Sequence, residues 1–229
     1  MIEAPGIKTR LENAWWAVRL FRNWPAFILD YLRAPRQPAV YRLRQGLFLR
    51  MRAGTSDFRI VREILVRGEY EPEGFEIGER DVVVDIGAQI GVFTVRAARA
   101  ARSGRVFSFE PHPDNFALLS DNVALNDLKH VQVFNRAVAA QPGEHEFFIS
   151  SFNTGGHSLY PKDGANRRIV VQTMALPDAL QASGLDRIDY LKIDCEGAER
   201  EILHGLPGEW LARVRRIVME VHDPVDTTG

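Results

Sequence analysis

The sequence is poor in cysteine, in lysine and in long apolar runs. Its 229 residues include a single cysteine, Cys195, and four lysines against 25 arginines. One cysteine excludes an internal disulfide and a zinc site built from several thiolates. No stretch reaches the roughly 18 apolar residues that a membrane-spanning helix needs. The first ten residues, MIEAPGIKTR, contain an early glutamate and no apolar segment, so we expect no secretory signal and a cytoplasmic location.

The composition is otherwise that of a folded globular protein, with 45% hydrophobic and 26% charged residues. At this length we expect one domain of ordinary size with an extension. The charge is unevenly distributed, because residues 1–67 carry 13 basic and 5 acidic side chains, whereas residues 68–229 carry 16 basic and 25 acidic ones. The sequence therefore predicts a basic N-terminal extension over residues 1–80 and a main domain over residues 81–229.

Three elements are expected in the extension. Residues 11–32 have a helical apolar pattern, which a proline kinks or divides. Residues 43–51 alternate apolar and basic side chains around a glycine, as a short hairpin does. A helix is expected over residues 58–66, with Ser56 or Asp57 as its N-terminal cap.

From residue 81 the pattern alternates between short apolar strands and helices. Strands are expected at 82–84, 105–110, 131–138, 190–193 and 216–221. Helices are expected at 91–101, 113–126, 177–182 and 198–203, and an antiparallel pair at 144–149 and 169–176. Repeated strand–helix–strand units imply an α/β fold with a mostly parallel sheet and helices on both faces.

The segment VVVDIGAQIG, residues 82–91, carries the clearest chemical signal. It consists of a strand, an acidic residue, two glycines four positions apart and the start of a helix. Ligands of open α/β sheets bind at the carboxyl ends of the strands, where Gly87 would let the backbone approach a ligand and Gly91 would let the helix start close to the strand. Glu110 ends the next strand, and a carboxylate there can accept hydrogen bonds from both hydroxyls of a ribose.

The same segment differs from a dinucleotide site, which requires G-x-G-x-x-G to hold a pyrophosphate. Asp85, two residues before Gly87, would repel a pyrophosphate. It suits a cationic ligand, such as the ammonium or sulfonium group of S-adenosylmethionine. The alternative is a strand–turn–helix whose glycines serve packing only.

Six ordered blocks of the sequence resemble the FkbM family of S-adenosylmethionine-dependent methyltransferases, within the class I (Rossmann-like) group. The resemblance runs from about residue 42 to 222. The blocks are VVVDIGAQIGVFT, VFSFEPHPDNFALLSDNVALN, VQVFNRAVA, NTGGHSL, DYLKIDCEGAEREILHG and IVMEVH. The family usually has asparagine at the position of Gln89 and valine at that of Cys195. The resemblance implies an O-methyltransferase that acts on a hydroxyl of a sugar, glycan or secondary metabolite.

The resemblance also implies roles for individual residues. The methionine end of the cofactor would contact the first motif, through Asp85, Gly87, Gln89 and Gly91. Glu110 would hold the ribose, and the turn Asn135, Arg136 and Ala137 would border the adenine. Methyl transfer to a hydroxyl needs alignment, exclusion of water and a general base. We expect Asp194 or Glu196 as that base, with His222 behind them.

Several of these side chains also allow plainer interpretations. His222 can be a structural histidine at the end of a strand, and His157, with Asn153 in the same polar loop, can contact the acceptor or belong to a mobile segment. Asp57 can pair with nearby arginines or close over the cofactor. We expect no metal. The alternative is Mg²⁺ held by Asp194 and Glu196 together with Glu220 or Asp223.

The aromatic and basic residues of the extension, over residues 11–36, suit the surface of an anionic membrane. The alternative is that the aromatic side chains pack on the domain or on a second subunit. A peripheral membrane protein that docks near lipid-linked glycans, and a family member that binds the cofactor without turnover, are the competing functions. The N-P-P-Y motif of base methylation is missing, so we expect no nucleic-acid partner.

The number of predicted strands is also informative. Class I sheets usually have seven strands, whereas five are predicted here in the main sheet. We expect that the last two are missing from this sequence or from the natural protein. The resulting exposed edge strand can be covered in a homodimer.

Overall fold

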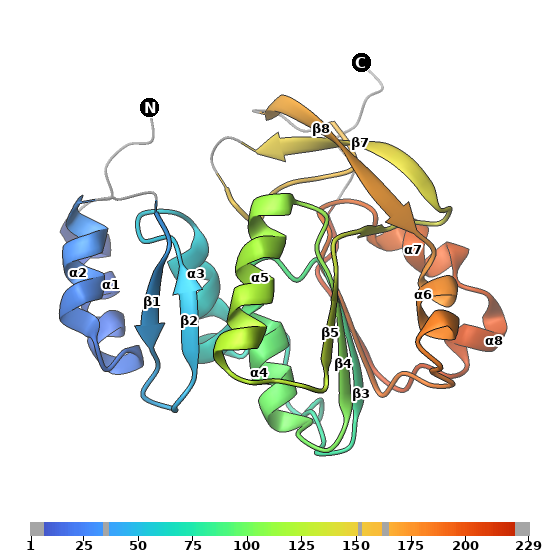
Figure 1. Cartoon of the computed structure of the whole chain (residues 1–229), viewed down its shortest axis with the longest axis horizontal. Coiled ribbons are helices and arrows are strands. Elements are labelled where there is room, and N and C mark those ends of the chain that lie inside the picture. Colours follow the sequence, from blue (N-terminus) through green and yellow to red (C-terminus); the bar gives the residue numbers. More distant parts are fainter. Residues whose placement is uncertain (1–6, 34–36, 151–152, 162–164, 223–229) are drawn as a thin grey trace.

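The computed structural model describes residues 7–33, 37–150, 153–161 and 165–222. Its main sheet has five parallel strands in the order β10-β9-β3-β4-β5 (Figure 1). They are β3 (Val82–Ile86), β4 (Arg105–Phe109), β5 (Val131–Phe134), β9 (Tyr190–Ile193) and β10 (Ile217–Met219). The chain thus starts in the middle of the sheet, moves to one edge and returns to the other side of β3. This is the doubly wound α/β order, and it places the ligand crevice where the order reverses, at the carboxyl ends of β3 and β9.

Helices cover both faces of the sheet. On one face lie α4 (Val92–Ala100) and α5 (Pro113–Leu125), and on the other lie α6 (Leu176–Ala182), α7 (Glu199–Gly205) and α8 (Gly208–Leu211) (Figure 1). Neighbouring strand residues serve opposite cores, since Val83 packs with α4 and Val84 packs with α6 and α7. This alternation, with both faces apolar, is why the buried strands are almost continuously hydrophobic.

The extension consists of α1 (Ile7–Leu20), α2 (Trp24–Arg33), the hairpin β1 (Ala39–Arg42) and β2 (Phe48–Met51), and α3 (Asp57–Arg62), which runs into a π-helical turn, Glu63–Arg67. An aromatic cluster joins these elements, with Phe27 between Phe21, Tyr41 and Phe58 at ring distances of 4.4–5.3 Å. The same apolar core continues to Phe93 and Tyr190 of the main domain. The extension is therefore part of one packed unit with the α4 face of the sheet.

The structure corrects three details of the expected elements. The break between α1 and α2 falls at Phe21–Asn23, and Pro25 is the second residue of α2, where a missing N–H is tolerated. Ser56 has no side-chain capping bond, because its hydroxyl pairs with Thr154 instead. Asp57 is the first residue of α3 and does not cap it.

The expected strand at 131–138 is two strands. β5 ends at Phe134, and β6 (Ala137–Val138) joins a second sheet with β7 (Gly143–Ser150) and β8 (Ala165–Met174) in the order β6-β8-β7. The antiparallel pairing of β7 with β8 is as expected from the sequence. Among the described residues, no helix is long and apolar enough to cross a membrane.

Candidate active site

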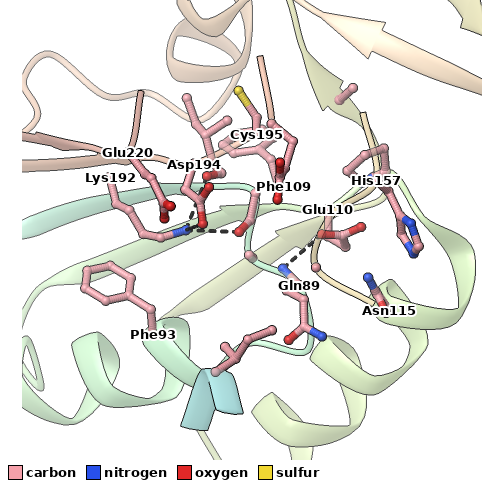
Figure 2. Close-up of a pocket in the computed structure, with 18 of the residues that line it drawn as sticks. Gln89, Phe93, Phe109, Glu110, Asn115, His157, Lys192, Asp194, Cys195 and Glu220 are labelled. Atoms are coloured by element: carbon pink, nitrogen blue, oxygen red, sulfur yellow. Dashed lines mark hydrogen bonds and ion pairs between the residues drawn. The ribbon is translucent and has the colours of Figure 1, made fainter. Parts of the chain in front are cut away.

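A cavity of about 290 Å³ lies at the carboxyl ends of β3, β4 and β9 (Figure 2). It is lined by Gly87 and Ala88 of the turn after β3, by residues of the π-helical turn and of the loop 153–160, and by the segment after β9. Of the residues expected at the site, the following line it: Gly87, Gln89, Glu110, Arg136, Ala137, Asn153, His157, Asp194, Glu196 and His222. Asp57, Asp85, Gly91 and Asn135 do not.

The turn after β3 is tightly constrained. Gly87 has φ +77°, and a Cβ there would lie 1.6 Å from the carbonyl oxygen of Asp194. Gln89 adopts φ +53°, which is uncommon for a residue with a side chain. Its amide compensates, because Oε1 accepts a hydrogen bond from the N–H of Ile90 (2.8 Å) and Nε2 donates to Asp57 (3.0 Å). Close contact between this turn and the end of β9 brings both segments to one cavity.

Glu110 is held in a fixed orientation at the cavity wall. Its side chain is 5% exposed, and its two oxygens accept hydrogen bonds from the backbone N–H groups of Gln89 (2.9 Å) and His112 (2.8 Å). Burial raises the pKa of Glu110 to about 7, although the two N–H groups act in the opposite direction. Each oxygen keeps a lone pair for a further donor, as two ribose hydroxyls would require.

Asp85 does not meet the expectation that it lines the cavity. It is fully buried, and its oxygens accept hydrogen bonds from Lys192 Nζ (3.0 Å) and Thr94 Oγ1 (2.7 Å). The alternation of strand β3 turns this side chain to the α4 face of the sheet, where it lies beside Lys192, its register partner on β9. Its negative charge is therefore matched within the protein, and it cannot supply the unpaired charge that was expected for a cationic ligand.

Lys192 is a buried cation that sequence reasoning missed. It is 2% exposed, lines the cavity, donates to the carbonyl of Gly87 (3.0 Å) and lies 4.0 Å from Asp194 (Figure 2). Burial lowers the pKa of Lys192, but Asp85 and Asp194 outweigh it and leave the pKa above the ordinary value. A lone lysine within the apolar strand YLKI was the signal in the sequence.

Gly91 and Asn135 support the site from outside the cavity. Gly91 has φ +83°, and a Cβ there would lie 2.5 Å from Leu119, so this glycine serves the packing of α4 on α5. Asn135 donates to the carbonyls of Glu110 (2.9 Å) and Pro111 (3.0 Å) and so ties the end of β5 to the segment after β4. Both residues therefore have supporting roles in the fold, and the cofactor contacts expected of them stay predictions.

The half of the cavity next to the ends of β9 and β10, here called the far half, is rich in carboxylates. Tyr70, which sequence reasoning also missed, donates its hydroxyl to Asp194 (2.7 Å) and approaches Glu220 (3.3 Å). Burial, followed by the charge of Asp194, raises the pKa of Tyr70, so it remains a hydrogen-bond donor. Burial and the nearby carboxylates also raise the pKa values of Glu69 and Glu220.

His222 contributes the imidazole of this half. Its Nδ1 lies 3.0 Å from Glu199, and its Nε2 lies 3.5 Å from both Glu196 and Glu220. The hydrogen bond with Glu199 and the surrounding carboxylates raise the pKa of His222 to about 9, against the effect of burial. Glu199, which was not expected at the site, is fully buried.

Asp194, Glu220 and His222 each present one possible ligand atom, and these atoms lie within 4.8 Å of one another. Tyr70 and Glu199 already hydrogen-bond to this group. The three side chains thus take part in the hydrogen-bond network of the cavity, and the absence of a metal stays a prediction. Asp223, the other candidate ligand of the magnesium alternative, lies outside the described residues.

The loop 153–160 is anchored through Asp57. This carboxylate is fully buried and accepts hydrogen bonds from Arg52 (2.9 Å), Gln89 (3.0 Å) and Thr154 (2.7 Å). Asp57 thus pairs with an arginine, as one of its two interpretations expected, and also links the loop to the turn after β3. That it closes over the cofactor stays a prediction.

His157, in the same loop, is packed and hydrogen-bonded. Its ring lies 4.4 Å from that of His112, and its Nδ1 accepts the N–H of Ser150 (3.1 Å). Burial, with the nearby His112, lowers the pKa of His157 to about 4, so the ring is neutral. A neutral, packed imidazole suits the wall of a binding site better than a proton-transfer role.

Known proteins give a consistent picture. A family model described as "Methyltransferase FkbM domain" matches residues 85–228. The chain is 30% identical over 172 residues to methyltransferase sdnD of Sordaria araneosa, a match that covers 62% of this chain and 66% of sdnD. It is 29% identical over 200 residues to 31-O-demethyl-FK506 methyltransferase FkbM of Streptomyces tacrolimicus, covering 75% of this chain and 76% of the relative.

A third relative is the hexuronic acid methyltransferase AglP of Haloferax volcanii, 27% identical over 158 residues, with 67% of this chain and 62% of AglP covered. The matches thus span less than two thirds of AglP and of sdnD. The family match, however, takes in more than half of the chain, including both motifs that meet at the cavity. The protein belongs to the FkbM methyltransferase domain family.

Proposed function

We propose that this chain is an S-adenosylmethionine-dependent O-methyltransferase that acts on a hydroxyl of a sugar, a glycan or a secondary metabolite. The observation that carries the proposal is Glu110, a buried carboxylate that two backbone N–H groups orient at the wall of the cavity. The names of two relatives, for an O-demethyl-FK506 and a hexuronic acid, support oxygen-rich acceptors.

The residues present fit this cofactor. Glu110 would accept hydrogen bonds from the ribose hydroxyls, Gly87 would expose its backbone to the methionine part, and Arg136 with Ala137 would border the adenine. The carboxylates of the far half, Asp194 among them, would balance the positive charge in place of Asp85. When bound, S-adenosylmethionine supplies the methyl group and retains the electron pair of the broken carbon–sulfur bond.

The protein would contribute alignment and a proton acceptor. The wall that includes Asn153 and His157 would orient the acceptor and limit access of water, which favours an in-line approach. Asp194, Glu196 and His222 face the same half of the cavity and are the candidates for the base.

The test is a titration with S-adenosylhomocysteine followed by an activity screen with labelled S-adenosylmethionine. The screen covers sugar and metabolite hydroxyls, with the matching deoxy or O-methyl compounds as controls. Saturable binding and label transfer only to acceptors with a free hydroxyl are expected. No measurable binding would sink the proposal, and binding without product from any acceptor would favour the non-catalytic alternative.

We infer a second candidate function from the surface of α1, where a peripheral membrane contact would dock the enzyme near lipid-linked glycans. Leu11, Trp15 and Val18 repeat at helical spacing and are 66%, 49% and 39% exposed. The guanidinium of Arg19 lies 4.0 Å from the centre of the Trp15 ring. Exposed apolar and basic side chains on one helix suit an anionic lipid surface.

Co-sedimentation with vesicles tests this candidate. Binding to phosphatidylserine vesicles but not to phosphatidylcholine vesicles, lost in a Leu11→Ser/Trp15→Ser variant, is expected. Equal recovery in the supernatant with both lipids would rule it out.

For Phe21 and Phe27 the alternative interpretation is correct, because both side chains are buried and pack on the domain. Arg36 of the same segment lies outside the described residues.

A further inference from the structure

We propose that Glu199 is a positioning residue, which holds His222 as the acceptor of the proton that the substrate hydroxyl loses. The inference rests on the proposed function and adds to it one residue and one choice among the three candidate bases. Glu199 is the first residue of α7, and His222 follows β10, so the two meet at the carboxyl ends of neighbouring strands β9 and β10.

The environment of Glu199 keeps it ionised. Its side chain has no exposed surface, and its oxygens accept the backbone N–H groups of Gly197 (2.9 and 3.0 Å) and Cys195 (3.2 Å). Although burial opposes the charge, the hydrogen bonds from His222 and from these N–H groups lower the pKa of Glu199 to about 2. A buried carboxylate is costly unless it is paired, and His222 is its side-chain partner here.

The backbone around Glu199 is shaped for this contact. Glu196 and Gly197 have φ values of +62° and +122°, so the chain turns sharply between β9 and α7. The turn aims the N–H groups of Cys195 and Gly197 at the carboxylate. A positive φ at a glutamate is unfavourable, and such positions often accompany functional sites.

The hydrogen bond with Glu199 determines which nitrogen of His222 can react. With the proton on Nδ1 donated to Glu199, the lone pair of the neutral ring is on Nε2. Nε2 is the nitrogen nearest to Glu196 and Glu220, the carboxylates on the cavity side. A buried carboxylate that orients an imidazole in this way is the arrangement that serine hydrolases use for their base.

The charged groups around His222 favour it over Asp194. The imidazole is faced by Glu196, Glu199, Glu220 and, farther away, Asp194, and all four stabilise the protonated ring. Asp194 already accepts the Tyr70 hydroxyl and lies 4.0 Å from Lys192, so its carboxylate is engaged by other side chains of the protein. The Nε2 atom of His222 instead lies among carboxylates that favour the protonated ring.

In the proposed step the acceptor O–H bond breaks and its proton moves to Nε2 of His222. The oxygen keeps the electron pair and uses it to bond the methyl carbon. The imidazolium is then stabilised by Glu199, and the proton is later released to solvent. Since the ring must be neutral before each turnover, the rate should rise with pH up to about 9.

A histidine NMR titration of the full chain tests the pairing without any turnover. The His222 signals are identified by their loss in His222→Ala. In Glu199→Gln the pKa of His222 should fall by at least about one unit, because the charge that stabilises the imidazolium is gone. The exposed Glu209→Gln should leave it unchanged. An unshifted His222 in Glu199→Gln would overturn the proposal.

Kinetics then separates positioning from a purely structural role. Glu199→Gln should lower kcat by about 10²–10⁴-fold with little change in acceptor KM or in S-adenosylhomocysteine affinity. In a His222→Ala background the same change should alter kcat less than about twofold, since residues that act as a unit are not additive. Additive losses would contradict the proposal. If the pKa of His222 falls in Glu199→Gln as expected but no acceptor is methylated, the proposed function is refuted and the pairing of Glu199 with His222 is still supported.

Discussion

At the scale of single residues, the pocket is governed by a few buried charges, each with a defined set of partners. Glu110 is oriented by backbone N–H groups, Asp85 and Lys192 neutralise each other, and Glu199 is bonded to His222. Substitution of Glu110 at the cavity wall should therefore change ligand affinity, whereas substitution within the internal pair of Asp85 and Lys192 should change stability.

Cofactor affinity should depend on pH through Glu110. Burial raises the pKa of Glu110 to about 7, whereas donation from two ribose hydroxyls favours the ionised form. Binding therefore requires loss of a proton when the pH is below about 7, and affinity for S-adenosylhomocysteine should increase from pH 6 to pH 8. Calorimetry measures this. Glu110→Gln should bind at least about tenfold more weakly and without the pH trend, while the exposed Glu73→Gln should match the wild type. A wild-type affinity independent of pH would contradict this role.

Removing one member of the buried pair of Lys192 and Asp85 should lower the free energy of unfolding strongly, whereas replacing both should lower it much less. Lys192→Met leaves the Asp85 carboxylate buried without its cation, and the free energy of unfolding should fall by about 3–5 kcal/mol. Adding Asp85→Asn to this variant removes the uncompensated charge, so much of the loss should be recovered. Urea unfolding measures both. A double variant no more stable than Lys192→Met would show that the pair has another role.

At the scale of elements, the site depends on how closely the turn after β3 approaches the segment after β9. Gly87 and Gly74 have similar positive φ values of +77° and +83°. A Cβ at Gly87 would meet the backbone of Asp194 at 1.6 Å, whereas nothing lies within 4 Å of a Cβ at Gly74. Comparing alanine substitutions at the two glycines therefore separates the destabilisation due to a positive φ from the destabilisation due to a steric clash.

Gly74→Ala should therefore lower the free energy of unfolding by only about 1–2 kcal/mol. Gly87→Ala must also displace β9 from β3, so we expect a further loss of several kcal/mol or failure to fold, because the obstacle is backbone and not a flexible side chain. Thermal and urea unfolding of the pair measure the difference. Equal stability of the two variants would show that the turn can relax away from β9.

The extension is held to the main domain by the side chains of Asn122 in α5 and of Asn126, which directly follows this helix. Asn122 accepts the N–H of Arg50 (2.5 Å) and donates to its carbonyl (3.0 Å), and Asn126 does the same for Phe48 (2.9 and 2.8 Å). Two asparagines one helical turn apart thus satisfy backbone groups on one edge of β2. Such pairing stabilises a short hairpin that would otherwise be marginal by itself.

At the scale of the whole molecule, the basic extension and the acidic domain are fused through one core, although their charges differ in sign. The predicted boundary at residue 80 therefore marks a change in composition, and we propose that both regions unfold together. This matters for experiments, because deleting residues 1–38 would remove Phe21 and Phe27 from the core. Surface substitutions are the better probe of the membrane candidate.

Cooperative unfolding can be checked with two aromatic residues of the extension. Phe27→Ala, at a site with no exposed surface, should lower the free energy of unfolding by about 3–5 kcal/mol for the entire protein, including the main sheet. Trp15→Ala, at a site 49% exposed, should cost less than about 1 kcal/mol. Hydrogen exchange in β3 and β4 reports the effect on the sheet. Protection there that is unaffected by Phe27→Ala would mean that the extension unfolds separately.

Dimerisation through the edge of the main sheet stays a prediction.

The sequence by itself determined the alternation of strands and helices in the main domain, the five-stranded main sheet, the family and ten of the residues that line the cavity. It could do so because apolar periodicity, glycines and acidic residues at strand ends are local signals. The antiparallel β7–β8 pair and Glu110 at the cavity follow from such patterns. The hairpin expected over residues 43–51 is present, but its first strand lies earlier, at Ala39–Arg42, and residues 43–47 form the connection.

Only the tertiary structure decided which charges line the cavity. Asp85 has the expected position in the chain, yet a lysine 107 residues later neutralises it. Tyr70, Lys192 and Glu199 joined the site for the same reason: each acts through a partner that is distant in sequence or through a turn whose shape depends on packing. Electrostatic roles depend on distance and burial, and both are set by the fold and not by local spacing.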